Sequence, residues 1–466
     1  MMPKHNRHIT IISYGFMIVF ACLLVYFSIF VLRDNSKLLN NPYNKTDDLM
    51  ADRIKRGNIL ASGGEILAES LIDSDGNETR SYPYDNIFAH VIGYYDKGRT
   101  GLEYSYNSYM LTSTINPVTK AVEELEGKKN PGDSLVTTLD VNMQKCAYQA
   151  LGSKKGAVIA MEPDTGAILA MVSKPDYNPN TIVKDWTKLN MDEDNSPLLN
   201  RATQGLYPPG STFKTLTLLE YIRENGNYND YSFKCKGQIN IDNYKMNCHN
   251  KKAHGMQDIK QAFANSCNSA FADIGLSLDI KSFRATCRSL LFNTELPFEF
   301  QYKQSSFALK KKDSKGEIMQ TCIGQGRTLI TPLHSLLIIS SFANGGYIVA
   351  PYIADKMVND SGNTVRDFSY AKKTQVISQE ENEFMNECLR EVVTSGTAAS
   401  LSGKSYNVYG KTGTAEYDSS GKSHAWFIGY AEKDGKKVAV SIIVEGAGTG
   451  SDYAVPIAGK LFDAYY

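Results

Sequence analysis

The chain has 466 residues, of which 42% are hydrophobic and 21% are charged. This composition is typical of globular domains with a large core, and it excludes a disordered chain, a disulfide-stapled miniprotein and a fibrous repeat. The 50 Lys and Arg residues balance the 50 Asp and Glu residues. The chain therefore has no overall basic field, and we expect no nucleic-acid partner.

Residues 9–32 form an uncharged and mostly apolar run. It exceeds the about 20 residues that cross a bilayer as a helix, so we predict a transmembrane anchor. Lys4 and Arg7 precede the run. By the positive-inside rule, residues 1–8 are then a cytoplasmic tail, and everything after the anchor lies on the extracytoplasmic side of the cell membrane. A cleaved signal peptide and a buried core helix are the alternatives, but the run is long for both and no small-x-small cleavage site follows it.

The rest of the chain divides into two predicted domains. Residues 33–135 are polar and rich in turns, which favours a small pedestal. Residues 136–466 alternate strand and helix patterns, so we predict an α/β (α+β) domain with helices on the faces of a sheet. Its predicted strands are 156–161, 167–172, 408–416, 425–431 and 438–445, with a hairpin connection at 432–437. Mainly helical sequence from about Ser211 to Gly346 and a closing helix over 454–466 complete the prediction.

The chain contains eight cysteines, of which Cys22 lies in the predicted anchor. The other seven are an odd number, so at least one thiol is free or pairs with another molecule. Cys235 and Cys248 are closest in sequence, and His249 and His254 follow them. A zinc site is conceivable there, but without a CxxC knuckle we favour a disulfide or buried thiols.

The first candidate catalytic pair is Ser211 and Lys214, within TyrProProGlySerThrPheLys at 207–214. On a helix these two side chains share a face. A partly desolvated lysine can take the proton of a serine hydroxyl and make it a nucleophile. The structural alternative is a helix cap beside a solvated lysine.

Two further motifs follow in order. SerCysAsn stands at 266–268, and LysThrGlyThr stands at 411–414 on a predicted strand. SxxK, SxN and KTG in this order are the signatures of penicillin-recognising serine acyltransferases. With the segments 156–173, 200–203, 324–326, 396–398 and 424–431, the chain from about residue 135 onwards resembles class B penicillin-binding proteins. The resemblance in the pedestal is patchier, through ArgGly (56–57) and GlyArgThrGlyLeuGlu (98–103).

The resemblance implies a fold and a function. The fold would be the penicillin-binding transpeptidase fold over 136–466, a central antiparallel sheet flanked by helices, with a small mixed α+β pedestal and one N-terminal transmembrane helix. The function would be that of a peptidoglycan D,D-transpeptidase that cleaves D-Ala-D-Ala through a serine acyl-enzyme, cross-links stem peptides and is acylated by β-lactams. No metal ion and no cofactor are expected.

The resemblance also assigns roles to matched positions. Ser211 would be the nucleophile, Lys214 its general base, Ser266 a proton relay towards the leaving amine, and Asn268 a support for Lys214 and the substrate amide. Lys411 would supply positive charge.

In the third motif, Thr412 and Thr414 would grip the terminal carboxylate across Gly413. The backbone N–H groups of Ser211 and Thr414 would form the oxyanion hole. A helix cap remains the structural alternative for Ser266, and a small buried filler is favoured over a redox-sensitive thiol for Cys267.

Other functions stay open beside the transpeptidase. A D,D-carboxypeptidase or β-lactamase on the same fold would use water in place of the acceptor amine, and a non-catalytic sensor would only bind the ligand. The resemblance further implies a partner, a polytopic glycan polymerase of the shape, elongation, division and sporulation family, because we expect no glycosyltransferase domain in this chain.

Overall fold

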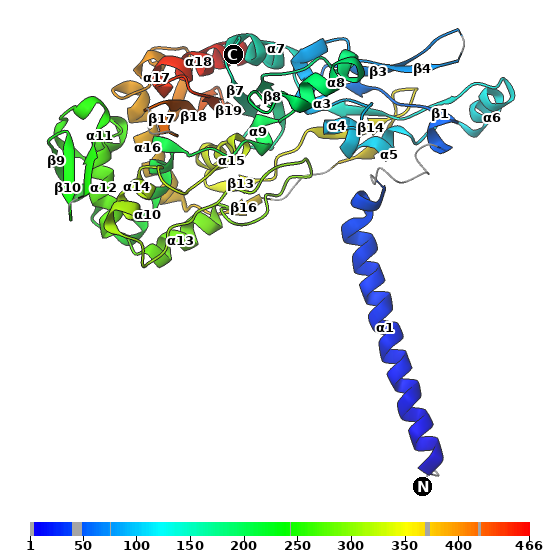
Figure 1. Ribbon diagram of the computed structural model, residues 1–466, viewed down its shortest axis with the longest axis horizontal. Coiled ribbons are helices and arrows are strands. Elements are labelled where there is room, and N and C mark those ends of the chain that lie inside the picture. Colours follow the sequence, from blue (N-terminus) through cyan, green and yellow to red (C-terminus); the bar gives the residue numbers. More distant parts are fainter. Residues whose placement is uncertain (1–3, 40–48, 75, 243, 369–372, 418–420) are drawn as a thin grey trace.

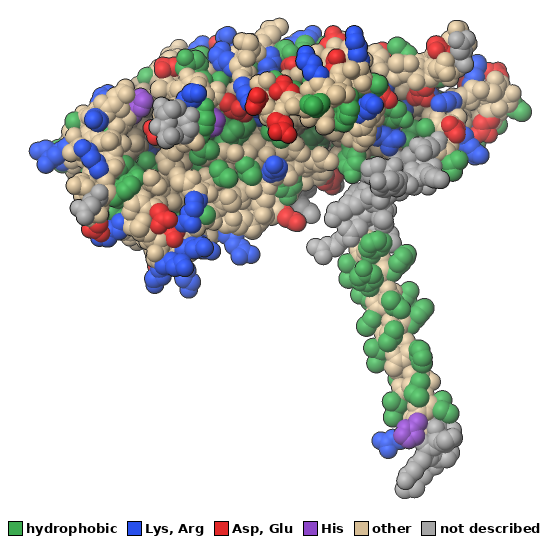
Figure 2. All heavy atoms as spheres, viewed as in Figure 1, with side chains coloured by type: hydrophobic (Ala, Val, Ile, Leu, Met, Phe, Trp, Pro, Cys, Tyr) green, Lys and Arg blue, Asp and Glu red, His purple; other side chains and the backbone are tan. Residues whose placement is uncertain are grey.

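The computed structural model describes residues 4–39, 49–74, 76–242, 244–368, 373–417 and 421–466. Helix α1 (Lys4–Leu39) carries the predicted anchor. Within it, Arg7–Phe30 is long and apolar enough to cross a membrane, with a mean hydropathy of 2.3, and the rest of the protein buries none of it. Hydrophobic side chains cover this apolar stretch in Figure 2. A single N-terminal apolar helix of this kind fits a single-pass membrane anchor.

The pedestal range contains both short strands and short helices, so the predicted mixed α+β character is confirmed. Its elements are β1 (Ile54–Lys55), β2 (Ile59–Leu60), β3 (Ile66–Ile72), β4 (Glu78–Ser81), α3 (Ala89–Ile92), α4 (Gly101–Ser105), α5 (Asn107–Met110), α6 (Pro117–Leu125), β5 (Asn130–Pro131) and β6 (Ser134–Thr137).

The pedestal sheet has the strand order β15-β14-β6-β2-β3-β4. Its strands β14 (Ala354–Val358) and β15 (Thr364–Asp367) come from much later in the chain. Strand β6 runs across residue 135, and Leu135 pairs with both Ile59 and Met357. The pedestal and the C-terminal domain are therefore joined by strand pairing, and the domain limits drawn from the sequence stay predictions.

A buried ion-pair cluster holds the pedestal together. The carboxylate of Glu103 (0% exposed) accepts hydrogen bonds from Arg56 Nε at 2.8 Å and Arg80 Nε at 2.7 Å. Burial alone would raise the pKa of Glu103, but Arg80 and Arg56 outweigh burial and lower it. Both arginines also donate to backbone carbonyls, Arg56 to Glu103 O and Arg80 to Gly57 O. Of these residues, Arg56 and Glu103 belong to the pedestal segments 56–57 and 98–103 that resembled class B proteins.

The C-terminal domain is built on a five-stranded antiparallel sheet in the order β17-β18-β19-β7-β8. The strands are β7 (Gly156–Met161), β8 (Ile168–Lys174), β17 (Asn407–Glu416), β18 (Ser423–Lys433) and β19 (Lys436–Val444). All five predicted strands are confirmed to within a few residues at their ends. The β18–β19 turn is shorter than predicted, because Asp434 and Gly435 both adopt positive φ (51° and 77°), which closes a hairpin in two residues.

Helices cover both faces of this sheet (Figure 1). On one side lie α7 (Val141–Leu151) and α18 (Val455–Tyr465). Helix α18 confirms the closing helix predicted over 454–466, and the short α17 (Gly450–Tyr453) precedes it. On the other side lies α15 (Pro332–Ala343), every residue of which is buried. The antiparallel sheet flanked by helices is thus confirmed.

The segment predicted to be mainly helical contains α10 (Lys214–Glu224), α11 (Ile259–Ala264), α12 (Asn268–Ser277), α13 (Ile280–Ser289), α14 (Lys315–Cys322) and α15. The prediction missed four strands between α10 and α11, namely β9 (Ser232–Cys235), β10 (Gln238–Ile241), β11 (Tyr244–Asn247) and β12 (Gly255–Asp258). They pair as β9 with β12 and β10 with β11. Most of their side chains are exposed or half-buried, so they lack the apolar runs that mark buried strands.

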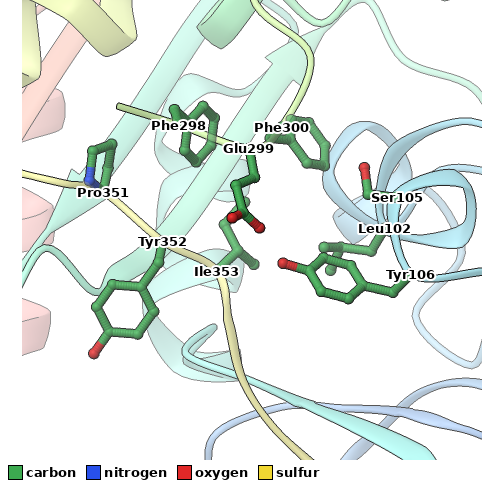
Figure 3. A pocket seen from close by; sticks show the side chains of 9 residues that line it. All are labelled: Leu102, Ser105, Tyr106, Phe298, Glu299, Phe300, Pro351, Tyr352 and Ile353. Atoms are coloured by element: carbon green, nitrogen blue, oxygen red, sulfur yellow. The ribbon is translucent and has the colours of Figure 1, made fainter. Parts of the chain in front are cut away.

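Further helices and strands lie between these elements along the chain. They are α8 (Ile182–Met191), α9 (Arg201–Gln204), β13 (Tyr347–Val349), β16 (Lys373–Gln375) and α16 (Gln379–Thr394). Where α4 meets the C-terminal domain, Figure 3 shows a pocket lined by Leu102, Ser105, Tyr106, Phe298, Glu299, Phe300, Pro351, Tyr352 and Ile353. Its volume of about 10 Å³ has room for one water at most, so it is a packing gap at the junction and not a ligand site.

Replacing Glu103 with glutamine should destabilise the pedestal strongly, because both buried guanidinium groups would lose their counter-charge. Breaking a buried pair in this way costs about 3–5 kcal/mol. We expect a lower thermal unfolding midpoint for Glu103→Gln in the detergent-solubilised protein. Glu126→Gln is the control: Glu126 pairs with Lys128 on the surface, with side chains 52% and 64% exposed, and such exposed pairs contribute little to stability. Equal melting of Glu103→Gln and wild type would contradict a structural role for the cluster.

Candidate active site

Ser211 lies on a turn that is packed directly against strand β17. The turn is a 3-10 helix, Gly210–Phe213, which runs straight into α10. The predicted regular helix therefore begins only at Lys214. Gly210 has φ 54°, and a Cβ there would lie 2.7 Å from the carbonyl oxygen of Thr414. Only glycine permits this close approach, which brings the first and third motifs together.

Three aromatic side chains hold the preceding residues of this turn. The indole N–H of Trp426 donates to the carbonyl of Pro208 (3.1 Å). The Tyr207 ring makes edge contacts with His424 and Trp426, and its hydroxyl donates to Glu445 (2.7 Å). Through these contacts Tyr207, His424 and Trp426 pack the turn against the sheet.

Lys214 is completely buried. Its ammonium Nζ donates to the Ser266 carbonyl (2.7 Å), to Ser266 Oγ (3.2 Å) and to Asn268 Oδ1 (2.8 Å). These three acceptors match the three protons of the ammonium group. Burial lowers the pKa of Lys214 to about 8, an effect that Cys267 and Cys248 partly offset. A lysine with such a pKa can give up its proton near neutral pH.

The second motif forms the turn between α11 and α12. Ser266 has φ 53°, an unusual conformation for a residue with a side chain. Cys267 caps the N-terminus of α12, and Asn268 is the first residue of that helix. The Asn268 amide bridges two elements, because Oδ1 accepts from Lys214 while Nδ2 donates to the carbonyl of Asn247, the last residue of β11 (2.9 Å).

The third motif lies on β17, with Lys411 fully buried. Burial, together with the nearby charge of Lys214, holds the pKa of Lys411 well below its usual range. Thr412 Oγ1 lies 2.6 Å from Thr397 Oγ1. A Cβ at Gly413 would come within 3.0 Å of Thr212 and Trp426, so a larger residue there would push the strand away from the nucleophile turn.

A cleft of about 760 Å³ opens over these residues. Of the predicted site residues, Ser211, Ser266, Asn268, Thr412 and Thr414 line it. Lys214 and Lys411 lie behind its wall, fully buried. The structure thus brings all three motifs together around one cavity large enough for a peptide.

Sequence reasoning missed part of the cleft wall. Thr397 and Gln325 line it, and both stand in segments that carried the family resemblance without an assigned role. Asn247 and Ser451 also line it. Ser451 Oγ donates to the Thr397 carbonyl (2.7 Å). No sequence signal marks either residue, since each reaches the cleft only through the fold.

Comparisons with known proteins agree with this geometry. The model of the penicillin-binding protein transpeptidase domain matches residues 156–463, and that of the penicillin-binding protein A dimerisation domain matches residues 56–135. The chain is 30% identical over 445 residues to the peptidoglycan D,D-transpeptidase MrdA of Acinetobacter baumannii, covering 83% of this chain and 66% of that relative. It is 28% identical over 488 residues to the peptidoglycan D,D-transpeptidase PbpA of Mycolicibacterium smegmatis, covering 97% of both.

Solved structures give the same answer. The D,D-transpeptidase domain of a peptidoglycan glycosyltransferase from Eggerthella lenta superposes with a TM-score of 0.80 at 29% identity, covering 89% of this chain and 98% of that one. Penicillin-binding protein A from M. tuberculosis, as its imipenem acyl-enzyme complex, superposes with a TM-score of 0.81 at 26% identity, covering 89% and 99%. With both domains matched and three motifs assembled at one cleft, the chain belongs to the penicillin-binding protein transpeptidase family, as a class B member.

Proposed function

We propose that this protein is a membrane-anchored peptidoglycan D,D-transpeptidase that works through an acyl-enzyme on Ser211. The observation that carries the proposal is the buried Lys214, whose Nζ bonds to Ser266 and Asn268 directly behind the cleft that Ser211 lines. The names of the relatives support it, as do the solved structures of the M. tuberculosis protein as imipenem, ceftriaxone and penicillin G acyl-enzymes.

In the acylation step, Ser211 Oγ attacks the carbonyl carbon of the D-Ala-D-Ala bond and passes its proton to neutral Lys214. The carbonyl oxygen becomes an oxyanion, which the backbone N–H groups of Ser211 and Thr414 stabilise. A donor at such a position contributes about 10²–10³ in rate. The intermediate collapses, the C–N bond breaks, and Ser266 relays the lysine proton to the leaving D-Ala amine.

Residues of β17 and the side chain of Asn268 position the substrate. Lys411 lies behind the strand, and when Lys214 is neutral the repulsion that lowers the pKa of Lys411 is relieved, which favours its positive charge there. The Thr412 and Thr414 hydroxyls donate to the terminal carboxylate of the stem peptide or of a β-lactam. Asn268 holds the substrate amide on the opposite wall. Its link to Asn247 fixes the direction of the side chain.

The acyl group then passes to an amine of a second stem peptide, which forms the cross-linking amide and frees Ser211. Attack by water in place of the amine would make the protein a D,D-carboxypeptidase or a β-lactamase. A scaffold would not form the ester at all. The lifetime of the ester therefore separates the three functions.

The anchor and the family resemblance support a proposal for membrane topology and for a partner. Lys4 and Arg7 precede the apolar stretch of α1, which favours a cytoplasmic N-terminus and a catalytic domain on the extracytoplasmic side. There the domain would meet stem peptides. A polytopic glycan polymerase that contacts the anchor and pedestal would supply the strands to be cross-linked.

Replacing Ser211 with alanine should abolish covalent labelling by a fluorescent penicillin, because no other group in the cleft would form the ester. We would follow intact mass over time for the full-length protein in detergent, with Ser402→Ala as a control that removes an exposed serine. A stable one-to-one adduct in wild type and Ser402→Ala alone supports the transpeptidase. A rapidly cleared adduct points to the hydrolase, and no adduct on folded wild type points to a scaffold.

The rate of acylation should rise with pH and level off above about 8, where the pKa of Lys214 lies. Below this pKa the protonated lysine cannot accept the serine proton. The titratable groups that face Lys214 are Lys411, Cys248 and Cys267. Stopped-flow acylation across the pH range measures the profile.

The matched variant for this profile is Lys214→Arg, which keeps the charge but cannot lose its proton. It should acylate at least about 10²-fold more slowly at every pH. A wild-type rate that does not change as the pH approaches about 8 would count against Lys214 as the base.

A further inference from the structure

Four metal-binding side chains meet beside the second motif. They are Cys235, Cys248, His254 and Cys267, and one ligand atom from each lies within 4.8 Å of all the others. Cys235 Sγ is 3.7 Å from Cys248 Sγ and 3.4 Å from His254 Nδ1. Cys248 Sγ is 3.8 Å from Cys267 Sγ. The three cysteines are buried and the histidine is half-buried.

These spacings fit one tetrahedral ion. With Zn–S near 2.3 Å and Zn–N near 2.05 Å, the edges of a tetrahedron are about 3.8 Å between sulfurs and about 3.6 Å between sulfur and nitrogen. Three thiolates and an imidazole are also the soft donor set that selects zinc. We propose that Cys235, Cys248, His254 and Cys267 form a structural zinc site.

Each sulfur also has a hydrogen-bond partner of the kind that stabilises a thiolate. The Gly237 N–H donates to Cys235 Sγ (3.3 Å), and the Ala270 N–H donates to Cys267 Sγ (3.5 Å). Ser269 Oγ lies 3.2 Å from Cys248 Sγ. Such outer partners orient ligands and support their charged form. On binding Zn²⁺ the three thiols would release their protons.

The alternatives from the sequence fit the arrangement less well. All of these cysteines are free in the structure. Their sulfurs stand well beyond the about 2.05 Å of a disulfide bond. A disulfide between any two of them would also not account for the third thiol and His254, which lie at the same place. Cys267 is therefore more than a buried filler, and zinc, which we ranked below a disulfide, is the better fit.

The site would join two parts of the cleft. Cys235, Cys248 and His254 belong to the segment with strands β9–β12, whereas Cys267 lies between Ser266 and Asn268 of the second motif. Asn247, next to Cys248, accepts the hydrogen bond from Asn268. An ion would thus fix the segment against the turn that holds Lys214, and it would act on catalysis by positioning that turn.

The test is the metal content of the full-length protein, purified without chelator and without added metal. Elemental analysis should find one zinc per chain in wild type. Cys248→Ser and His254→Ala should lose most of it, while Cys146→Ser and His249→Ala should keep it. Cys146 lies on α7, away from the cluster, and His249 is an exposed neighbour of Cys248.

A second readout uses the wild type alone, in case a ligand variant fails to fold. After removal of zinc, titration with Co²⁺ should give the visible and near-ultraviolet bands of a tetrahedral thiolate complex, saturating at one ion per chain. Because neither readout uses catalysis, failure of the proposed transpeptidase activity would leave this test unaffected.

Removal of zinc should also slow penicillin acylation by about 10-fold, as loss of a supporting ligand typically does, and added Zn²⁺ should restore it. A wild type with free thiols and no bound metal, one with a Cys235–Cys248 disulfide, or one with iron or copper in equal amount would overturn the zinc site. Acylation unaffected by zinc removal would overturn its positioning role.

Discussion

The buried ammonium group of Lys214 is the constraint around which the catalytic cleft is organised. A lysine at 0% exposure loses its hydration, and an unpaired charge in that position would cost several kcal/mol. The protein offsets this cost with a carbonyl and a hydroxyl from Ser266 and an amide oxygen from Asn268. The turn between α11 and α12 must therefore direct alternate residues towards one point, and the order Ser-x-Asn follows from that requirement.

Much of the fold could be predicted from the sequence, because its buried strands carry continuous apolar runs. Strands β7 and β19, buried almost throughout, lie within a residue or two of the predicted limits. Strands β9–β12 escaped prediction because their polar, half-exposed residues show no such run. The pairing of β6 with β14 was equally inaccessible, since strand pairs so distant in sequence depend on the tertiary fold and not on local pattern.

The candidate site likewise contains residues that could be predicted from the sequence and residues that could not. Ser211, Lys214, Ser266, Asn268 and the residues of 411–414 could be found because each stands in a short motif. Thr397 stands in the segment 396–398 that carried the resemblance, but only the fold places its hydroxyl against Thr412. Ser451, which donates to the Thr397 carbonyl, had no sequence signal. The proposed metal ligands could be predicted only in part. Cys235, Cys248 and His254 were noticed as neighbours, but Cys267 belongs to the catalytic motif, and only the fold places it with them.

The proposed zinc ion and Lys214 would act on opposite sides of one strained turn. Ser266 holds φ 53°, a conformation that costs about 1–3 kcal/mol for a residue other than glycine. Backbone bonds from Ser266 to Phe263 and from Cys267 to Ala262 support it. Ser266 and Asn268 face the lysine, whereas the residue between them faces the cysteine cluster. An ion bound by Cys267 would resist relaxation of the same backbone that the ammonium pulls from the other side. The ammonium of Lys214, held by Ser266 and Asn268, and the proposed zinc ion, held by Cys267, would thus keep the catalytic turn in the conformation that proton relay requires.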